Sequence, residues 1–160
     1  MNKYVNTETT FHSMKLLQLG ASVEIISGKM VYVEFKLKND IHVSYVYHIN
    51  KNNKYFLDRI KPYPLPIKEV EHANDVINLI KIDLEQFKNA VNSNNIRAFI
   101  DTNKELHQTM KSLEDLFLYY NVDDTYIGEM NKQIKSVKES IKAQAKVSQR
   151  VYNGKDPDNL

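Results

Sequence analysis

Hydrophobic residues alternate with other residues along the chain from residue 21 to residue 60. Alternation of this period places every second side chain on the same face of a β-strand. Clusters of Gly, Ser, Asn and Asp interrupt the alternation and are typical of turns. The pattern therefore predicts an antiparallel meander of four strands, formed by residues 21–26, 30–37, 41–49 and 54–60.

The alternation also assigns the tyrosines of this sheet to its two faces. Tyr45 and Tyr47 are in phase with Val43, so we expect them to lie in the core. Tyr32 is out of phase with Val31 and Val33, and we expect it on the exposed face. Exposed aromatic residues on a sheet can stack on bases or anchor a protein interface.

The residues before the meander predict a short helix. From Thr7 to Leu19 the apolar residues suit one side of a helix, with Thr7 as the N-cap and Gly20 as the stop. An edge strand is the alternative, because Thr9 and Thr10 are tolerated in strands. We favour the helix, and we expect it to cover the apolar face of the sheet.

Beyond Pro66 the apolar residues follow alternating steps of three and four, which is the period of an amphipathic helix. Three such stripes follow one another, along residues 70–91, 99–120 and 127–151. Helices of this length are about 40 Å long at 1.5 Å per residue. Short connections between long helices favour an antiparallel three-helix bundle. The predicted fold class is therefore α+β: a short N-terminal helix, a four-stranded antiparallel β-meander and a bundle of three long α-helices.

The stretch KPYPLP, residues 61–66, holds three of the four prolines. Proline fixes its own φ and disfavours helix in the residue before it, so we expect an elbow that ends the last strand and lets Pro66 open the first long helix. A proline-rich ligand for a groove-forming domain is the alternative. The predicted organisation is a helix-and-meander part at 1–65, the helical bundle at 66–153 and a flexible tail at 154–160.

The composition narrows the class of protein. The chain has no cysteine, which excludes disulfides and thiolate metal sites. It has no apolar stretch long enough for a bilayer and no secretory signal at its amino terminus, so we expect a cytoplasmic location and no membrane partner. Lysine outnumbers arginine 19 to 3. Such a bias is expected of an AT-rich gene, and we infer a low-GC bacterium or one of its phages.

Candidate metal and catalytic residues do not form a convincing pattern. Glu69 and His72 stand three apart, but they lie beside the apolar seam, and Glu105 and His107 stand two apart and face different ways. With only four glycines, the chain has no glycine-rich phosphate loop. We therefore expect neither a metal nor a cofactor.

One histidine pair remains an alternative. His42 and His48 share a strand face, and with Tyr32 or Asp58 they would suit acid–base work. No activated nucleophile stands near them in sequence, so we expect a surface role and no enzymatic activity.

The third long helix has a basic face. Six basic residues fall within an arc of about 120° at 100° per residue, opposite the apolar stripe. They are Lys132, Lys135, Lys138, Lys142, Lys146 and Arg150. This face could follow a phosphate backbone, so a nucleic-acid-associated protein is the alternative function.

The polar interruptions of the helical stripes indicate a protein interface. Asn103 is the polar residue of the second stripe, and Gln144 and Ser148 lie on the third stripe just before Val151. Such positions fix helix register or contact a partner's polar residues. We expect a non-enzymatic interaction protein, such as a regulator, inhibitor or adaptor, that binds another protein through its amphipathic helices and self-associates as a homodimer.

Overall fold

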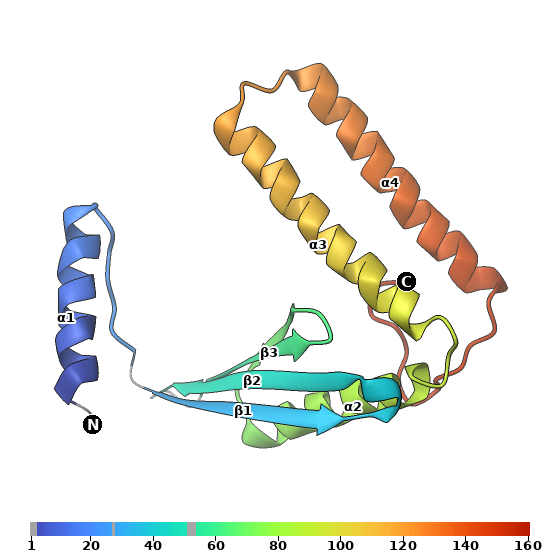
Figure 1. Ribbon diagram of the computed structural model, residues 1–160, viewed down its shortest axis with the longest axis horizontal. Helices are drawn as coiled ribbons and strands as arrows, with labels where there is room; N and C mark the ends of the chain where they lie inside the picture. Colours follow the sequence, from blue (N-terminus) through green and yellow to red (C-terminus); the bar gives the residue numbers. More distant parts are fainter. Residues whose placement is uncertain (1–2, 27, 51–53) are drawn as a thin grey trace.

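The computed structural model describes residues 3–26, 28–50 and 54–160, and its architecture is α+β, as the sequence predicts. An N-terminal helix precedes a four-stranded antiparallel sheet, and three helices follow it (Figure 1). The elements are α1 (Lys3–Gln18), β1 (Gly28–Lys36), β2 (His42–Asn50), β3 (Tyr55–Lys61), β4 (Leu65–Val70), α2 (Ala73–Ala90), α3 (Ile96–Tyr119) and α4 (Asp124–Val147). A single 3-10 turn, η1 (Lys38–Asp40), joins β1 to β2.

The sheet is a meander with the strand order β1-β2-β3-β4. Three strands agree with the prediction, but the fourth is β4 and not residues 21–26, which form no strand. The prediction that Pro66 opens a helix is wrong, because Pro66 lies within β4 opposite Asp58, where the register shifts. β4 is an edge strand, and an edge tolerates the missing N–H of proline.

The segment KPYPLP therefore connects two strands and does not separate two domains. It contains the turn from β3 to β4, and the predicted boundary between residues 65 and 66 falls inside β4. The first long helix begins only at Ala73, after an extended residue at His72.

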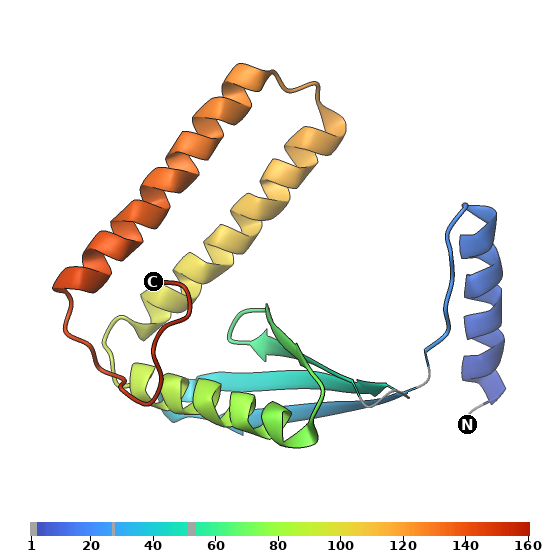
Figure 2. The same ribbon diagram turned by 180° about the vertical axis from the view of Figure 1, so that it is seen from behind.

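The apolar face of the sheet is covered by α2. Val43, Tyr45 and Leu57 of the sheet are almost fully buried, in one cluster with Val76 and Phe87 of α2. The expected burial of Tyr45 is confirmed, Tyr47 packs at the margin of this core, and Tyr32 is exposed as expected. The expectation that the N-terminal helix covers the sheet is wrong: α1 stands apart, at the end of the sheet where β1 begins (Figures 1 and 2).

A buried ion pair fastens α2 to the sheet. Arg59 on β3 is only 4% exposed, and its Nη1 lies 2.7 Å from Oδ1 of Asp83 on α2. The hydroxyl of Tyr45 donates a hydrogen bond of 2.8 Å to the other oxygen of Asp83. The Arg59 guanidinium also lies against the rings of Tyr63 and Phe87, 4.5 and 4.9 Å from their centroids. The charge is thus compensated by one carboxylate and two aromatic faces.

α3 and α4 form an antiparallel hairpin that projects from the sheet at the end opposite to α1 (Figures 1 and 2). Only Ile96 and Ile100, at the start of α3, are buried in these two helices, and α4 has no buried residue. After α4 the chain returns to α2, where Nδ2 of Asn89 donates to the carbonyl of Val151 at 3.0 Å. The three helices thus divide into one on the sheet and two in the hairpin.

Candidate functional site

The hairpin carries an apolar face that neither the sheet nor α2 covers. Both of its helices are amphipathic, and their apolar stripes remain largely exposed. Met110 is 64% exposed, Phe117 56% and Val137 51%. We use "hairpin apolar face" for Phe99, Leu106, Met110, Phe117, Ile134, Val137 and Ile141. A contiguous exposed apolar surface of this kind marks an interaction site more often than scattered apolar residues do.

An open groove runs between the two helices. It has a volume of about 410 Å³, and it is lined mainly by Leu106, Met110, Leu113, Leu116, Met130 and Ile134. Its remaining lining residues are Thr109, Ser112 and Tyr126, so no charged residue contributes to its wall. The half-buried residues Leu113, Leu116, Ile127 and Met130 gather near the loop that joins the helices. From residue 131 to residue 147 every residue of α4 is exposed.

The polar residues predicted to form the interface make hydrogen bonds to residues close to them in the sequence. Asn103 donates from Nδ2 to the carbonyl of Phe99 on its own helix at 2.9 Å. Gln144 donates from Nε2 to Oγ of Ser148 at 3.0 Å. Val151 lies beyond the end of α4 and is held by Asn89 of α2. The apolar residues of the hairpin, and not these polar ones, therefore define the candidate interface.

The basic face of α4 is present but shorter than predicted. Lys132 to Lys146 are exposed on α4, and Lys132 lies 3.6 Å from Glu129. Lys135, Lys138, Lys142 and Lys146 form no ion pair with any residue that the structure describes. The prediction that Arg150 extends this face is wrong. α4 ends at Val147, and Arg150 instead pairs with Asp156 at 2.8 Å and donates to two carbonyls of the tail.

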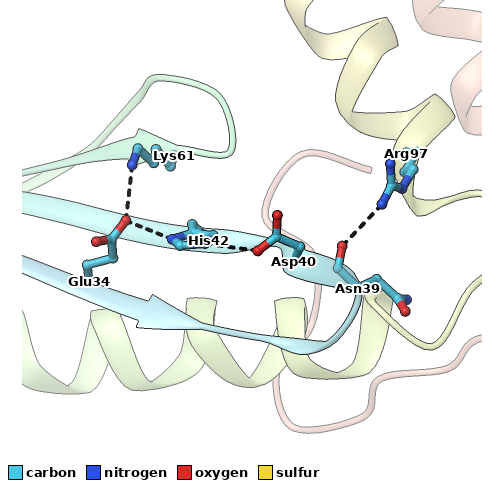
Figure 3. Close-up of polar contacts among 6 residues, drawn as sticks. All are labelled: Glu34, Asn39, Asp40, His42, Lys61 and Arg97. Carbon is cyan, nitrogen blue, oxygen red and sulfur yellow. Dashed lines mark hydrogen bonds and ion pairs between the residues drawn. The ribbon is translucent and has the colours of Figure 1, made fainter.

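A second candidate site is a polar cleft of about 450 Å³ between the end of the sheet and the start of α3 (Figure 3). Nδ1 of His42 lies 3.0 Å from Oε1 of Glu34, and its Nε2 lies 3.4 Å from Asp40. Nζ of Lys61 donates to the same oxygen of Glu34 at 3.0 Å. Arg97 of α3 donates to the carbonyl of Asn39 at 3.3 Å.

The geometry of this cleft favours a structural role. Asn39 and Asp40 have φ values of 60° and 57°, in the left-handed region that Asn and Asp tolerate better than most residues. In this conformation Asn39 accepts from Arg97 and donates from Nδ2 to the carbonyl of Val91 at 3.0 Å. The turn between β1 and β2 is thereby fastened to the base of the hairpin.

The charged groups of the cleft neutralise one another. The pKa of Glu34 is lowered, chiefly because its carboxylate accepts a hydrogen bond from Lys61 and then because of His42. The pKa of Lys61 is raised by the same contact with Glu34. Both groups are held in their charged forms, whereas a general acid needs a raised carboxyl pKa.

The structure does not unite the histidines proposed as the alternative acid–base site. His48 lies six residues from His42 on β2, a separation of about 20 Å along the strand. It pairs across the sheet with Met30 and Phe56, away from the cleft.

The carboxylates and histidines considered as metal ligands are also apart. Glu69 pairs with Lys54 at 2.9 Å, and Nδ1 of His107 lies 2.9 Å from the carbonyl of Asn103. Within residues 3–26, 28–50 and 54–160, no group of three or more His, Asp or Glu residues could hold a metal ion. None of the described helices is both long enough and apolar enough to cross a bilayer.

Comparison with known proteins gives no relative. No protein-family model, curated protein or solved structure matches the chain.

Proposed function

We propose that the chain is a non-enzymatic protein–protein interaction module, a regulator, inhibitor or adaptor of bacterial or phage origin. The observation that supports this proposal is the hairpin apolar face. The lysine-rich composition supports the bacterial or phage origin. The paired charges of the polar cleft support a structural role for the second candidate site.

The energetics of the hairpin favour a bound partner. Full burial of a large apolar side chain stabilises by about 1.5–3 kcal/mol relative to exposure. The hairpin apolar face contains seven such side chains, each between 40% and 64% exposed. A partner that covers them recovers a substantial hydrophobic free energy without any change in the sheet. An amphipathic helix is the simplest shape that enters a groove between two helices.

A photoreactive residue on the groove tests this function. We place p-benzoylphenylalanine at Met110 in one variant and at Gln108 in a matched control, and we express both in bacterial cells. Gln108 is exposed, but it lies about 200° from Met110 around α3. Irradiation is expected to give adducts with a protein, a second copy included, from position 110 and at least tenfold fewer from position 108. Equal yields from both positions, or none from 110, contradict the proposal.

The lysines of α4 support a second candidate function, contact with a nucleic-acid backbone. Lys135, Lys138, Lys142 and Lys146 are exposed, and none of them has an ion-pair partner among the described residues. Neutralising several phosphates makes affinity fall steeply with salt.

A charge reversal separates this function from the first. Changing these four lysines to Glu is expected to abolish binding of a fluorescent DNA or RNA oligonucleotide at low salt. The matched control reverses Lys36, Lys81, Lys88 and Lys155, which lie outside α4. If the α4 variant binds as the wild type does, the nucleic-acid function is excluded.

A further inference from the structure

α1 exposes an apolar stripe of its own. Phe11, Met14 and Leu17 are each more than half exposed. They fall within an arc of about 120°, and the other exposed apolar residues of this helix, Val5 and Leu16, lie on its opposite side. α1 lies away from both the sheet and the hairpin (Figures 1 and 2). Within the described residues, α1 therefore packs against no other element, and no helix fills the groove between α3 and α4.

The groove is long enough for the apolar residues of α1 and matches them in chemistry. α1 has 16 residues and is about 24 Å long at 1.5 Å per residue. The α3 wall of the groove runs from Leu106 to Leu116, a distance of about 15 Å on the same measure. The stripe from Phe11 to Leu17 fits within that length. The wall of the groove holds no charged residue, as an apolar stripe requires.

The charges around the two surfaces are opposite in sign. The part of the hairpin that surrounds the groove, residues 105–134, carries two lysines, Lys111 and Lys132. It carries six acidic residues: Glu105, Glu114, Asp115, Asp123, Asp124 and Glu129. α1 carries two lysines and one glutamate. The net negative charge of this part of the hairpin attracts a basic helix and disfavours an acidic one.

The connection to β1 limits which groove α1 can enter. Nine residues separate Gln18 from Gly28, and even fully extended they span only about 32 Å. β1 alone covers about 30 Å, and the groove begins about 15 Å above the base of the hairpin. A straight path from the start of β1 to the groove of the same chain would need all nine connecting residues fully extended. None of them would then be left to form a turn. A groove in a second copy has no such limit.

We propose that two copies of the chain exchange their N-terminal helices, so that α1 of each copy fills the groove between α3 and α4 of the other. The exchange is reciprocal and closes with a twofold axis, because each copy gives one helix and receives one. This inference rests on the proposed function of the hairpin and identifies the partner as a second copy.

Cysteine pairing tests the exchange in the full-length protein. The natural chain has no cysteine, so every disulfide formed comes from the introduced residues. One chain carries Met14→Cys, and the other carries Leu106→Cys, Met110→Cys or Leu113→Cys, to sample the register along the groove. The two chains are mixed, unfolded, refolded together and mildly oxidised. At least one mixture is expected to give a covalent dimer, with a peptide bridge between residue 14 and the groove.

Two controls decide the interpretation. His12→Cys is two residues from Met14 and about 200° around the helix, and Gln108→Cys lies behind the groove. Both are expected to give at least tenfold less covalent dimer. The exchange is wrong if none of the three mixtures forms the bridge. It is also wrong if a chain with both Met14→Cys and Met110→Cys closes the bridge within itself.

The two proposals can fail separately. If no mixture forms the bridge but a photoreactive residue at position 110 still captures a protein, the exchange is wrong and the interaction function stands. If position 110 captures nothing, both are wrong.

Discussion

Arg59 brings a positive charge into the core between β3 and α2. The carboxylate of Asp83 lies 2.7 Å away and is its only ion-pair partner among the described residues. Removal of one member of a buried pair leaves the other charge desolvated and uncompensated, which costs about 3–5 kcal/mol. The attachment of α2 to the sheet therefore depends on this ion pair.

Asp83→Ala is therefore expected to lower the free energy of unfolding by about 3 kcal/mol or more. Urea denaturation followed by circular dichroism measures the change. The matched control is Asp101→Ala, which removes an exposed pair with Lys104 and is expected to cost less than about 1 kcal/mol. Similar losses in the two variants would show that the Arg59 pair does not stabilise the core.

Tyr45 makes the stability of the fold depend on pH in the alkaline range. Its pKa is raised, first by burial and then by the negative charge of Asp83. A tyrosine in the unfolded chain loses its proton near pH 10, so the raised folded-state pKa stabilises the fold below that pH. The stability is lost as pH rises from there toward the folded-state pKa. The pKa of Tyr63 is raised by burial and acts in the same direction.

Tyr45→Phe is expected to separate two effects of this hydroxyl. Near pH 7 the variant loses the hydrogen bond to Asp83 and about 1–3 kcal/mol. Between pH 9 and pH 11, in the window about the pH 10 reference, its free energy of unfolding is expected to fall less than that of the wild type. Urea denaturation at several pH values measures both. Parallel curves for the two proteins would contradict the assignment of the alkaline loss to Tyr45.

Sequence alternation predicts that Tyr45 is buried and Tyr32 exposed, but it predicts neither the burial of Tyr63 nor that of the charged residue Arg59. Arg59 is in phase with Leu57 on β3, so its position on the covered face follows from the pattern. Its partner lies 24 residues further on, in α2. No local period connects those two positions, because the contact depends on how α2 lies across the sheet.

At the scale of elements, the period predicts β1, β2, β3 and the three long helices, but residues 21–26, which also alternate, form no strand. The misplaced fourth strand has a specific cause: the prolines of residues 61–66 indicate the end of the sheet, whereas the chain turns there and forms β4. Leu65–Val70 contains Pro66 and is exposed except at Ile67 and Val70, so it has little of the alternation that identified β1 to β3. As an edge strand, β4 tolerates Pro66, because one of its sides makes no ladder hydrogen bonds.

Asp123 determines where α4 begins. Its side chain accepts a hydrogen bond of 2.9 Å from the backbone N–H of Tyr126. Asp123→Ala is expected to cost about 1 kcal/mol and to speed amide exchange in the first turn of α4. Asp124→Ala is the control, because Asp124 lies in the first turn and gives only the smaller dipole interaction of about 0.3–1 kcal/mol. Faster exchange in the control than in Asp123→Ala would contradict this assignment.

At the scale of the whole molecule, the sequence predicted three amphipathic helices but not their division. An apolar stripe packs against a sheet as well as against another helix, so the stripe of α2 does not reveal that β2, β3 and β4 are its neighbours. Because α2 packs on the sheet, its apolar stripe is not available to cover α3 and α4 beyond the start of α3. Two helices leave a groove that a third would fill, which explains the exposure of their stripes.

From the hairpin apolar face we propose that this protein acts by binding a protein through α3 and α4, and that the partner is a second copy. The most direct test is the mass of the purified full-length protein, measured by light scattering across a size-exclusion peak. We expect two chains for the wild type and for Gln108→Glu, and one chain for Met110→Glu. A wild-type mass of one chain over a wide range of concentration, or two chains in Met110→Glu, would contradict the dimer.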